Sequence, residues 1–447
     1  MQGPSTASAT HLTDTGSPGG PTVPWGFNEF WGYSPSGTWS AGLATSQLHL
    51  AADIMPDSLS ANRFFVQWRR VEWTRDQYSW TNTQNDYDVM QANGVKPVMV
   101  IHDAPNWARD PAATCPSAAG CTYPPLPAYD GEWQQFVRDA VSRFPNVRAI
   151  EVWNEPNKAQ FWGPAPDPGR YVELLALAHD AVAAAGSSAP VIIGGLGPVT
   201  STTATRISSR EFLREIYNQG CACDFEGIGT HAYPRTEPFV DEMWRETNRL
   251  FAVRDNHNDP GTPLWNTEVG VSSDPTEGVG PGRQGTELVR LYRSIEGHEI
   301  ESFIIYRFHD AADGTPYWNH TGVVEQNLAP KPAYCELGAA IGEQAVACPD
   351  TPDTEAPQTT IASGPQGKTT NASPSFTFSS SELDSSFECR LDSGSWSSCT
   401  TPKSYQNLAA GTHVFEVRAT DPAGNTDPTP AARSFKLIIG GGKRGGG

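Results

Sequence analysis

The chain has 447 residues, with 50 acidic and 31 basic side chains, and its formal net charge is −19. This length exceeds one ordinary domain and predicts a second one. The acidic balance disfavours nucleic acids and anionic membranes as partners, because phosphate binding needs clustered Lys and Arg, and no apolar run reaches the roughly 18 residues that span a bilayer.

The first 20 residues are polar and rich in Ser, Thr and Gly, which predicts a disordered N-terminal segment over residues 1–20. They lack the apolar stretch of a secretory signal peptide. Because the cysteines described below favour secretion, we expect that a signal peptide has already been removed.

Between residues 21 and 347, short apolar or β-branched runs alternate with helix-length segments. This alternation indicates a parallel sheet with helical crossovers, and eight such runs are what a (β/α)8 TIM barrel requires. We therefore predict an α/β fold with a barrel over residues 21–347. The expected strands are Trp25–Asn28, Asn62–Trp68, Lys96–His102, Val147–Trp153, Val191–Leu196, Phe225–His231, Thr262–Glu268 and Ser302–Phe308.

The segments between these runs have apolar residues at intervals of three and four, as in Trp133–Phe144 and Tyr171–Val182. This spacing is typical of helices with one apolar face. We expect these faces to pack against the outside of the barrel.

Two glutamates lie at the carboxyl ends of predicted strands: Glu155 follows the fourth strand and Glu268 ends the seventh. Barrel enzymes keep their chemistry at this face. Cleavage of a glycosidic bond with retention needs a proton donor at the leaving oxygen and a carboxylate beneath the anomeric carbon, about 5–5.5 Å apart. The pair therefore predicts a retaining glycoside hydrolase.

Around these glutamates the chain resembles the clan A glycoside hydrolases, in particular the family typified by β-xylosidases and bacterial exopolysaccharide hydrolases. The resemblance covers roughly residues 24–345 and depends on Asn154-Glu155-Pro156 together with Glu268. It implies that Glu155 is the acid/base, that Glu268 is the nucleophile, and that Asn154 hydrogen-bonds the sugar hydroxyl next to the anomeric carbon. A lone Asn-Glu-Pro also occurs in unrelated loops.

The same resemblance implies that His231 and Tyr233 approach the nucleophile and that Arg63 lies beneath it. A tyrosine hydroxyl can orient a carboxylate. The arginine would lower the pKa of Glu268, whereas burial and the second carboxylate would raise that of Glu155. The alternatives are a hydrogen-bonded strand-end histidine and a structural ion pair for the arginine.

Sugar rings stack on aromatic side chains through their C–H faces, and the chain has 14 tryptophans. We expect Trp107, Trp162 and Trp318 to contact substrate, with a core position in a long loop as the alternative for each. His102 precedes a loop that resembles the corresponding loop of these hydrolases and is a further sugar-contact candidate. Tyr306 stands where many clan members place the tryptophan floor of the first sugar subsite.

The eight cysteines fall into local pairs, which predict disulfides and therefore a secreted protein. Only one pair has a spacing close to that of a zinc motif, and it lacks further ligands nearby, so we expect no metal and no other cofactor. The sequence leaves the connectivity open. The pairs are Cys115/Cys121, Cys221/Cys223, Cys335/Cys348 and Cys389/Cys399.

Beyond residue 347 the composition changes. Residues 348–357 form a Pro/Asp/Thr-rich linker, and residues 358–438 alternate apolar and polar side chains in short runs typical of a small Ig-like β-sandwich. Residues 421–427 resemble the late hairpin turn of bacterial Ig-like domains, with a calcium loop as the alternative. We expect the sandwich to act as a spacer and residues 439–447 to form a flexible Gly-rich tail.

Together these features predict a secreted monomer that cleaves β-glycosidic or α-L-arabinosidic bonds in a carbohydrate substrate. An uncharged or weakly charged glycan suits the acidic surface. The alternatives are a non-catalytic glycan-binding or adhesive protein and a transglycosylase that uses the same site. The sequence does not choose the sugar, and the long insertion from Ala108 to Tyr129 is the main candidate for setting endo or exo action.

Overall fold

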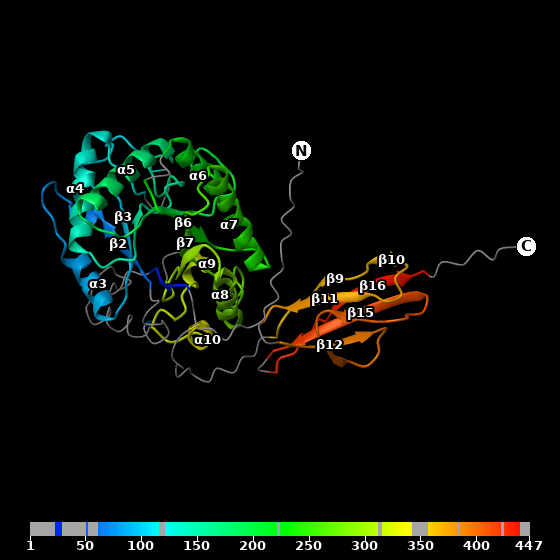
Figure 1. Ribbon diagram of the computed structural model, residues 1–447. Coiled ribbons are helices and arrows are strands. Elements are labelled where there is room, and N and C mark those ends of the chain that lie inside the picture. Colours follow the sequence, from blue (N-terminus) through cyan, green and yellow to red (C-terminus); the bar gives the residue numbers. More distant parts are fainter. Residues whose placement is uncertain are drawn as a thin grey trace, which may run out of the picture.

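A computed structural model describes residues 23–28, 51, 61–115, 121–220, 224–311, 315–341, 356–382, 385–421 and 424–438. Figure 1 shows a parallel sheet ringed by helices, with the C-terminal strands lying to one side of it. The predicted fold class, a (β/α)8 barrel followed by all-β sheets, is confirmed.

The barrel strands are parallel and form an eight-stranded sheet in the order β1-β8-β7-β6-β5-β4-β3-β2. A parallel bridge between Asn28 and Arg63 joins the two ends of this order, so the barrel is nearly closed. All eight predicted strands are present, with the largest boundary difference in β8. They are β1 (Trp25–Phe27), β2 (Arg63–Gln67), β3 (Val98–His102), β4 (Ala149–Val152), β5 (Val191–Leu196), β6 (Gly227–Ala232), β7 (Leu264–Val269) and β8 (Ile300–Ile305).

Helices cover the outside of the barrel (Figure 1). Two of them begin at a side chain that caps the helix. Asp167 accepts a hydrogen bond from the Arg170 amide at the start of α5, and Ser208 does the same for Glu211 at the start of α6. The helices are α2 (Trp68–Val71), α3 (Thr81–Ala92), η1 (Pro127–Tyr129), α4 (Asp130–Arg143), α5 (Pro168–Ala184), α6 (Ser209–Asn218), α7 (Phe239–Asn256), α8 (Pro281–Ile295), α9 (Pro316–Asn319) and α10 (Pro332–Ile341).

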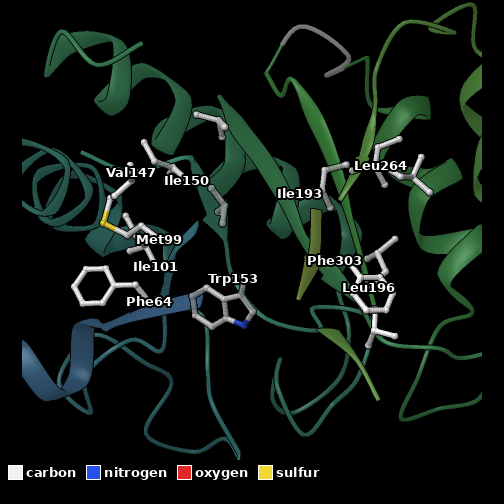
Figure 2. Close-up of a cluster of buried hydrophobic side chains, with 14 of the residues drawn as sticks. Phe64, Met99, Ile101, Val147, Ile150, Trp153, Ile193, Leu196, Leu264 and Phe303 are labelled. Atoms are coloured by element: carbon white, nitrogen blue, oxygen red, sulfur yellow. The ribbon is translucent and has the colours of Figure 1, made fainter. Parts of the chain in front are cut away.

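The main hydrophobic core lies between the sheet and these helices. Figure 2 shows part of it, where Phe64, Met99 and Ile101 lie near Ile150 and where Trp153 directly follows β4. Strands buried on both faces are expected to be apolar throughout, which explains why runs of apolar residues predicted them. Any charged side chain inside such a strand therefore needs a partner.

The C-terminal strands form two sheets, ordered β10-β16-β15-β12-β13 and β14-β11-β9. Phe376, Phe378, Phe415 and Phe435 form their shared core. The Ig-like assignment and the domain boundaries remain predictions. The strands are β9 (Thr359–Ser363), β10 (Gly367–Thr369), β11 (Ser375–Ser380), β12 (Ser386–Leu391), β13 (Ser397–Cys399), β14 (Lys403–Ser404), β15 (Gly411–Thr420) and β16 (Ala431–Leu437).

Two of the predicted disulfides are confirmed, Cys115–Cys121 and Cys389–Cys399. The other two predicted pairs involve Cys221, Cys223 and Cys348, which lie outside the described residues. Within the described part of the chain, no helix has the length and apolar character needed to cross a membrane.

Candidate active site

Glu155 and Glu268 face each other at the carboxyl end of the barrel. Oxygen atoms of the two side chains and a ring nitrogen of His231 all lie within 4.8 Å of one another. This separation matches the retaining arrangement rather than the roughly 6.5–9.5 Å of inverting enzymes. The backbone after β4 has positive φ angles of 75° at Trp153 and 44° at Glu155, a conformation that costs about 1–3 kcal/mol per residue and is common at functional sites.

His231, on β6, lies between the two carboxylates. Its Nδ1 atom is 3.1 Å from Oε1 of Glu155 and 3.2 Å from Oε2 of Glu268. A Cβ atom at position 195 would lie 2.1 Å from the His231 Nε2 atom, so only glycine at Gly195 leaves room for this ring. His231 therefore contacts both Glu268 and Glu155, and its role in a reaction stays a prediction.

The Glu268 carboxylate is held by donors from three other segments. Oε1 accepts hydrogen bonds from Asn28 Nδ2 at 3.0 Å and from Arg63 Nη1, and Oε2 accepts one from the Tyr233 hydroxyl at 2.5 Å. Burial and the nearby Glu268 charge raise the Tyr233 pKa well above its usual value, so this hydroxyl stays a donor. Asn28 was not predicted as a site residue.

Arg63 also binds a second buried glutamate that sequence reasoning missed. Its Nε and Nη2 atoms donate to Glu151, on β4, at 3.0 and 2.9 Å. Glu151 accepts further hydrogen bonds from the Gly195 amide at 2.6 Å and from the Thr267 hydroxyl at 3.2 Å. Burial disfavours the charged guanidinium, but Glu151 and Glu268 outweigh burial and raise the Arg63 pKa. The available signal was a lone carboxylate within an apolar strand.

Glu155 has an unpredicted cation as its closest partner. Lys158 Nζ lies 2.6 Å from Oε2 of Glu155. Burial raises the pKa of Glu155, but the Lys158 charge and the His231 contact outweigh burial and bring the pKa down to about 2. The prediction that the Glu155 pKa is raised is therefore wrong, because it considered burial and the second carboxylate but not Lys158.

Asn154 and His102 line the same end of the barrel. The Asn154 side-chain oxygen accepts a hydrogen bond from Arg63 at 2.9 Å. His102 ends β3 and is 5% exposed, and neither ring nitrogen has a hydrogen-bond partner among the described residues. Burial, aided by nearby arginines, lowers its pKa to about 3, so the ring is neutral near pH 7. The expected sugar contacts of both residues stay predictions.

Three aromatic rings pack against one another beside Glu268. Tyr306 and Trp318 lie with their ring centroids 5.4 Å apart, and Trp318 lies 4.9 Å from Tyr233. Burial raises the Tyr306 pKa to about 12. Trp318 is half-buried, so one part of its surface stays open, and it lies next to Tyr306.

The other two predicted tryptophans pack within the protein. Trp162 is 1% exposed and contacts Trp153 at a centroid distance of 4.9 Å, so the expected sugar contact is corrected to a core position. Trp107 is half-buried, packs against Trp68 at 5.5 Å and donates its indole N–H to the Glu72 carbonyl at 3.2 Å. A substrate contact of Trp107 stays a prediction.

Glu155, His231 and Glu268 are residue types that bind divalent metals, and their donor atoms lie close enough to share an ion. However, the Arg63 cation already pairs with Glu268, and the Lys158 cation pairs with Glu155. A divalent cation would have to compete with both. The arrangement therefore favours proton transfer and nucleophilic attack over metal binding.

No family model matches the chain. Similar solved structures include a family 39 glycoside hydrolase from Bacteroides cellulosilyticus WH2, with 16% identity, a TM-score of 0.56, and coverage of 93% of this chain and 79% of that one. A family 39 β-xylosidase from Caulobacter crescentus has 18% identity, a TM-score of 0.53 and coverage of 83% of each chain. A family 39 enzyme from Xanthomonas axonopodis pv. citri has 14% identity, a TM-score of 0.53, and coverage of 94% of this chain and 93% of that one. These likenesses establish a shared fold.

Proposed function

We propose that the protein is a retaining glycoside hydrolase that cleaves β-glycosidic or α-L-arabinosidic bonds. The observation that supports this most directly is the opposed pair Glu155 and Glu268, with His231 in contact with both. Each carboxylate lies at the carboxyl end of its barrel region, on β7 or directly after β4. The solved structures that share the fold include a β-xylosidase, which agrees with this proposal.

The proposed reaction is a double displacement. Glu155 protonates the leaving oxygen while Glu268 attacks the anomeric carbon and forms a glycosyl ester. Glu155 then removes a proton from water, which attacks the ester and restores the enzyme. Asn28, Arg63 and Tyr233 hold the Glu268 carboxylate in one orientation through both steps.

The confirmed disulfides Cys115–Cys121 and Cys389–Cys399 support a protein that works in an oxidising compartment outside the cell. For the C-terminal sheets we propose a spacer role. Their single tryptophan, Trp396, is half-buried, and the guanidinium groups of Arg390 and Arg418 lie over its ring at 4.4 and 4.5 Å.

The deciding experiment incubates the protein with a panel of aryl β- and α-glycosides and with plant and bacterial polysaccharides, and measures the released sugar. Glu268→Gln should lower turnover by at least about 10³-fold, because no carboxylate remains to form the ester. Glu173→Gln, which changes a glutamate that is 61% exposed on α5, is the matched control and should leave turnover unchanged.

Two results would contradict the proposal. Turnover that survives in Glu268→Gln would exclude Glu268 as the nucleophile. Glycan binding without turnover across the whole panel would indicate a binding protein instead. Product analysis with an acceptor sugar present separates hydrolysis from transglycosylation.

A further inference from the structure

Two loops beside Glu155 are joined by a short antiparallel pairing. The Ala159 amide donates to the Thr205 carbonyl at 2.8 Å, and the Ile207 amide donates to the Asn157 carbonyl at 2.9 Å. These two bonds flank the bridge between Lys158 and Arg206. Lys158 and Arg206 therefore form a non-hydrogen-bonded antiparallel pair. In such a pair the two opposite side chains project from the same face, and the Cα atoms are about 4.5 Å apart.

The pairing therefore places two cations side by side. Lys158 is 31% exposed and bonds to Glu155, whereas Arg206 is exposed. Within the described part of the chain, no carboxylate lies at ion-pair distance from the Arg206 guanidinium. Like charges directly opposite each other destabilise a strand pair. An anion between or above them would relieve that repulsion.

The position of Lys158 relative to Glu155 indicates which part of a bound substrate Lys158 would contact. His231 contacts Oε1 of Glu155 and also contacts Glu268, whereas Lys158 contacts Oε2 of Glu155. A Cβ atom at position 197 would lie 2.7 Å from Oε1 of Glu155 and 2.8 Å from Cε of Lys158, so Gly197 provides the space that both side chains occupy. Because Glu268 lies beneath the anomeric carbon, the far side of Glu155 meets the leaving group.

We propose that Lys158 and Arg206 bind an anionic substituent, the carboxylate of a uronic acid or a sulfate ester, on the leaving-group sugar. The natural substrate is then an acidic glycan, not the uncharged or weakly charged one that the net charge suggests. The bound anion shares the Lys158 ammonium with Glu155, which frees the Glu155 carboxyl to exchange its proton with the glycosidic oxygen. This inference rests on the proposed glycosidase function.

The test uses three aryl glycosides of the sugar that the panel selects, with 4-nitrophenol, 3-carboxy-4-nitrophenol or 3-sulfo-4-nitrophenol as the leaving group. The readout is the ratio of kcat/KM for each charged substrate to kcat/KM for the neutral one. Intrinsic leaving-group reactivity is the same for every variant, so a change in this ratio reports the contact with the charge. The carboxylated and sulfonated substrates separate the two sources of the anion.

Arg206→Gln should lower the charged-to-neutral ratio about tenfold relative to the unmodified protein. Arg245→Gln, which removes an exposed arginine from the outer helix α7, is the matched control and should keep the ratio of the unmodified protein. Lys158→Met should lower the ratio as well. Thermal unfolding of each variant verifies that it is folded.

A ratio that is the same in Arg206→Gln and in the unmodified protein would overturn the inference while the glycosidase function stands. A decrease with the carboxylated substrate alone identifies a uronic acid, and a decrease with the sulfonated substrate alone identifies a sulfate ester. If the unmodified protein cleaves none of the glycosides, the proposed function and this inference both fail.

Discussion

Arg63 links the two buried glutamates Glu151 and Glu268. It is fully buried, and its guanidinium pairs with Glu151 on one side and with Glu268 on the other. A buried cation without partners is costly, and two carboxylates in bonding contact offset that cost. The planar guanidinium thus fixes the Glu268 carboxylate relative to β4, the strand that leads to Glu155.

Glu151→Gln should destabilise the protein by about 3 kcal/mol, because it removes one charge from a buried ion pair and leaves Arg63 undercompensated. It should also lower kcat, since the Arg63 guanidinium is then free to shift relative to Glu268. Urea unfolding and steady-state kinetics measure the two effects. Glu173→Gln, which changes an exposed partner of Arg170, should alter stability by less than about 1 kcal/mol. Equal stability of the two variants would contradict this account of Glu151.

The Lys158 ammonium makes the stability of the protein depend on pH. The folded-state pKa of Glu155 is about 2, below the usual value of 4.5. The ionised carboxylate therefore contributes stability above about pH 4.5, and this contribution is lost as pH falls toward 2. Lys158→Met removes the charge that lowers this pKa, so the variant should lose less of its unfolding free energy between pH 6 and pH 3 than the unmodified protein does.

Denaturant unfolding at several pH values measures this difference, with Lys158→Arg as the control that keeps the charge. Lys158→Met should also move the basic limb of the kcat/KM profile to higher pH, because it raises the Glu155 pKa and Glu155 must be protonated for the first step. Identical unfolding profiles for Lys158→Met and Lys158→Arg would show that the ammonium does not govern Glu155.

Some residues of the site could be predicted from their neighbours in the sequence, whereas others depend on contacts with distant segments. The positions of Glu155 and Glu268 could be predicted because each lies at or just beyond the carboxyl end of a strand that its own neighbours define. Glu151 could not be assigned a role, since its partner Arg63 lies 88 residues away and meets it only through the register of the barrel. Lys158 was missed for a different reason: its contact with Glu155 depends on the turn after β4, where Glu155 has a positive φ.

At the scale of elements, the loop after β4 is held from both sides. The Thr122 amide donates to the Gln160 carbonyl at 3.0 Å, and the Gly163 amide donates to the Thr122 carbonyl at 2.9 Å. The pairing of Lys158 with Arg206 holds the other side. The insertion from Ala108 to Tyr129 is thus tied through Thr122 to the loop that carries Glu155. Its expected effect on endo or exo action stays a prediction.

Elements were easier to predict than the positions of aromatic residues on them. A strand buried on both faces needs a run of apolar residues, and this run is visible in the sequence. A tryptophan in a loop gives no such signal, because core packing and sugar stacking both favour it. Trp162 lies in the core and Trp318 keeps an open surface, a difference that only the packing around each ring reveals.

At the scale of the whole molecule, the barrel and the C-terminal sheets meet through α8 (Figure 1). Arg290 donates to the Ser380 carbonyl at 3.0 Å and to the Ser381 carbonyl, and its guanidinium also pairs with Glu287 at 3.2 Å. A cation that binds two backbone carbonyls fixes the end of β11 against the helix. The contact lies on the outside of the barrel, so it can set the orientation of the sheets without touching the carboxylates.

Arg290→Gln should therefore loosen this junction by about 1–3 kcal/mol, since two charge-assisted hydrogen bonds are lost from a partly exposed site. Scanning calorimetry should show the unfolding of the sheets separating from that of the barrel, while kcat/KM on a small aryl glycoside stays the same. Arg293→Gln, an exposed neighbour on α8, is the control and should change neither quantity. A loss of activity on small substrates in Arg290→Gln would mean that the sheets support the catalytic barrel and are more than a spacer.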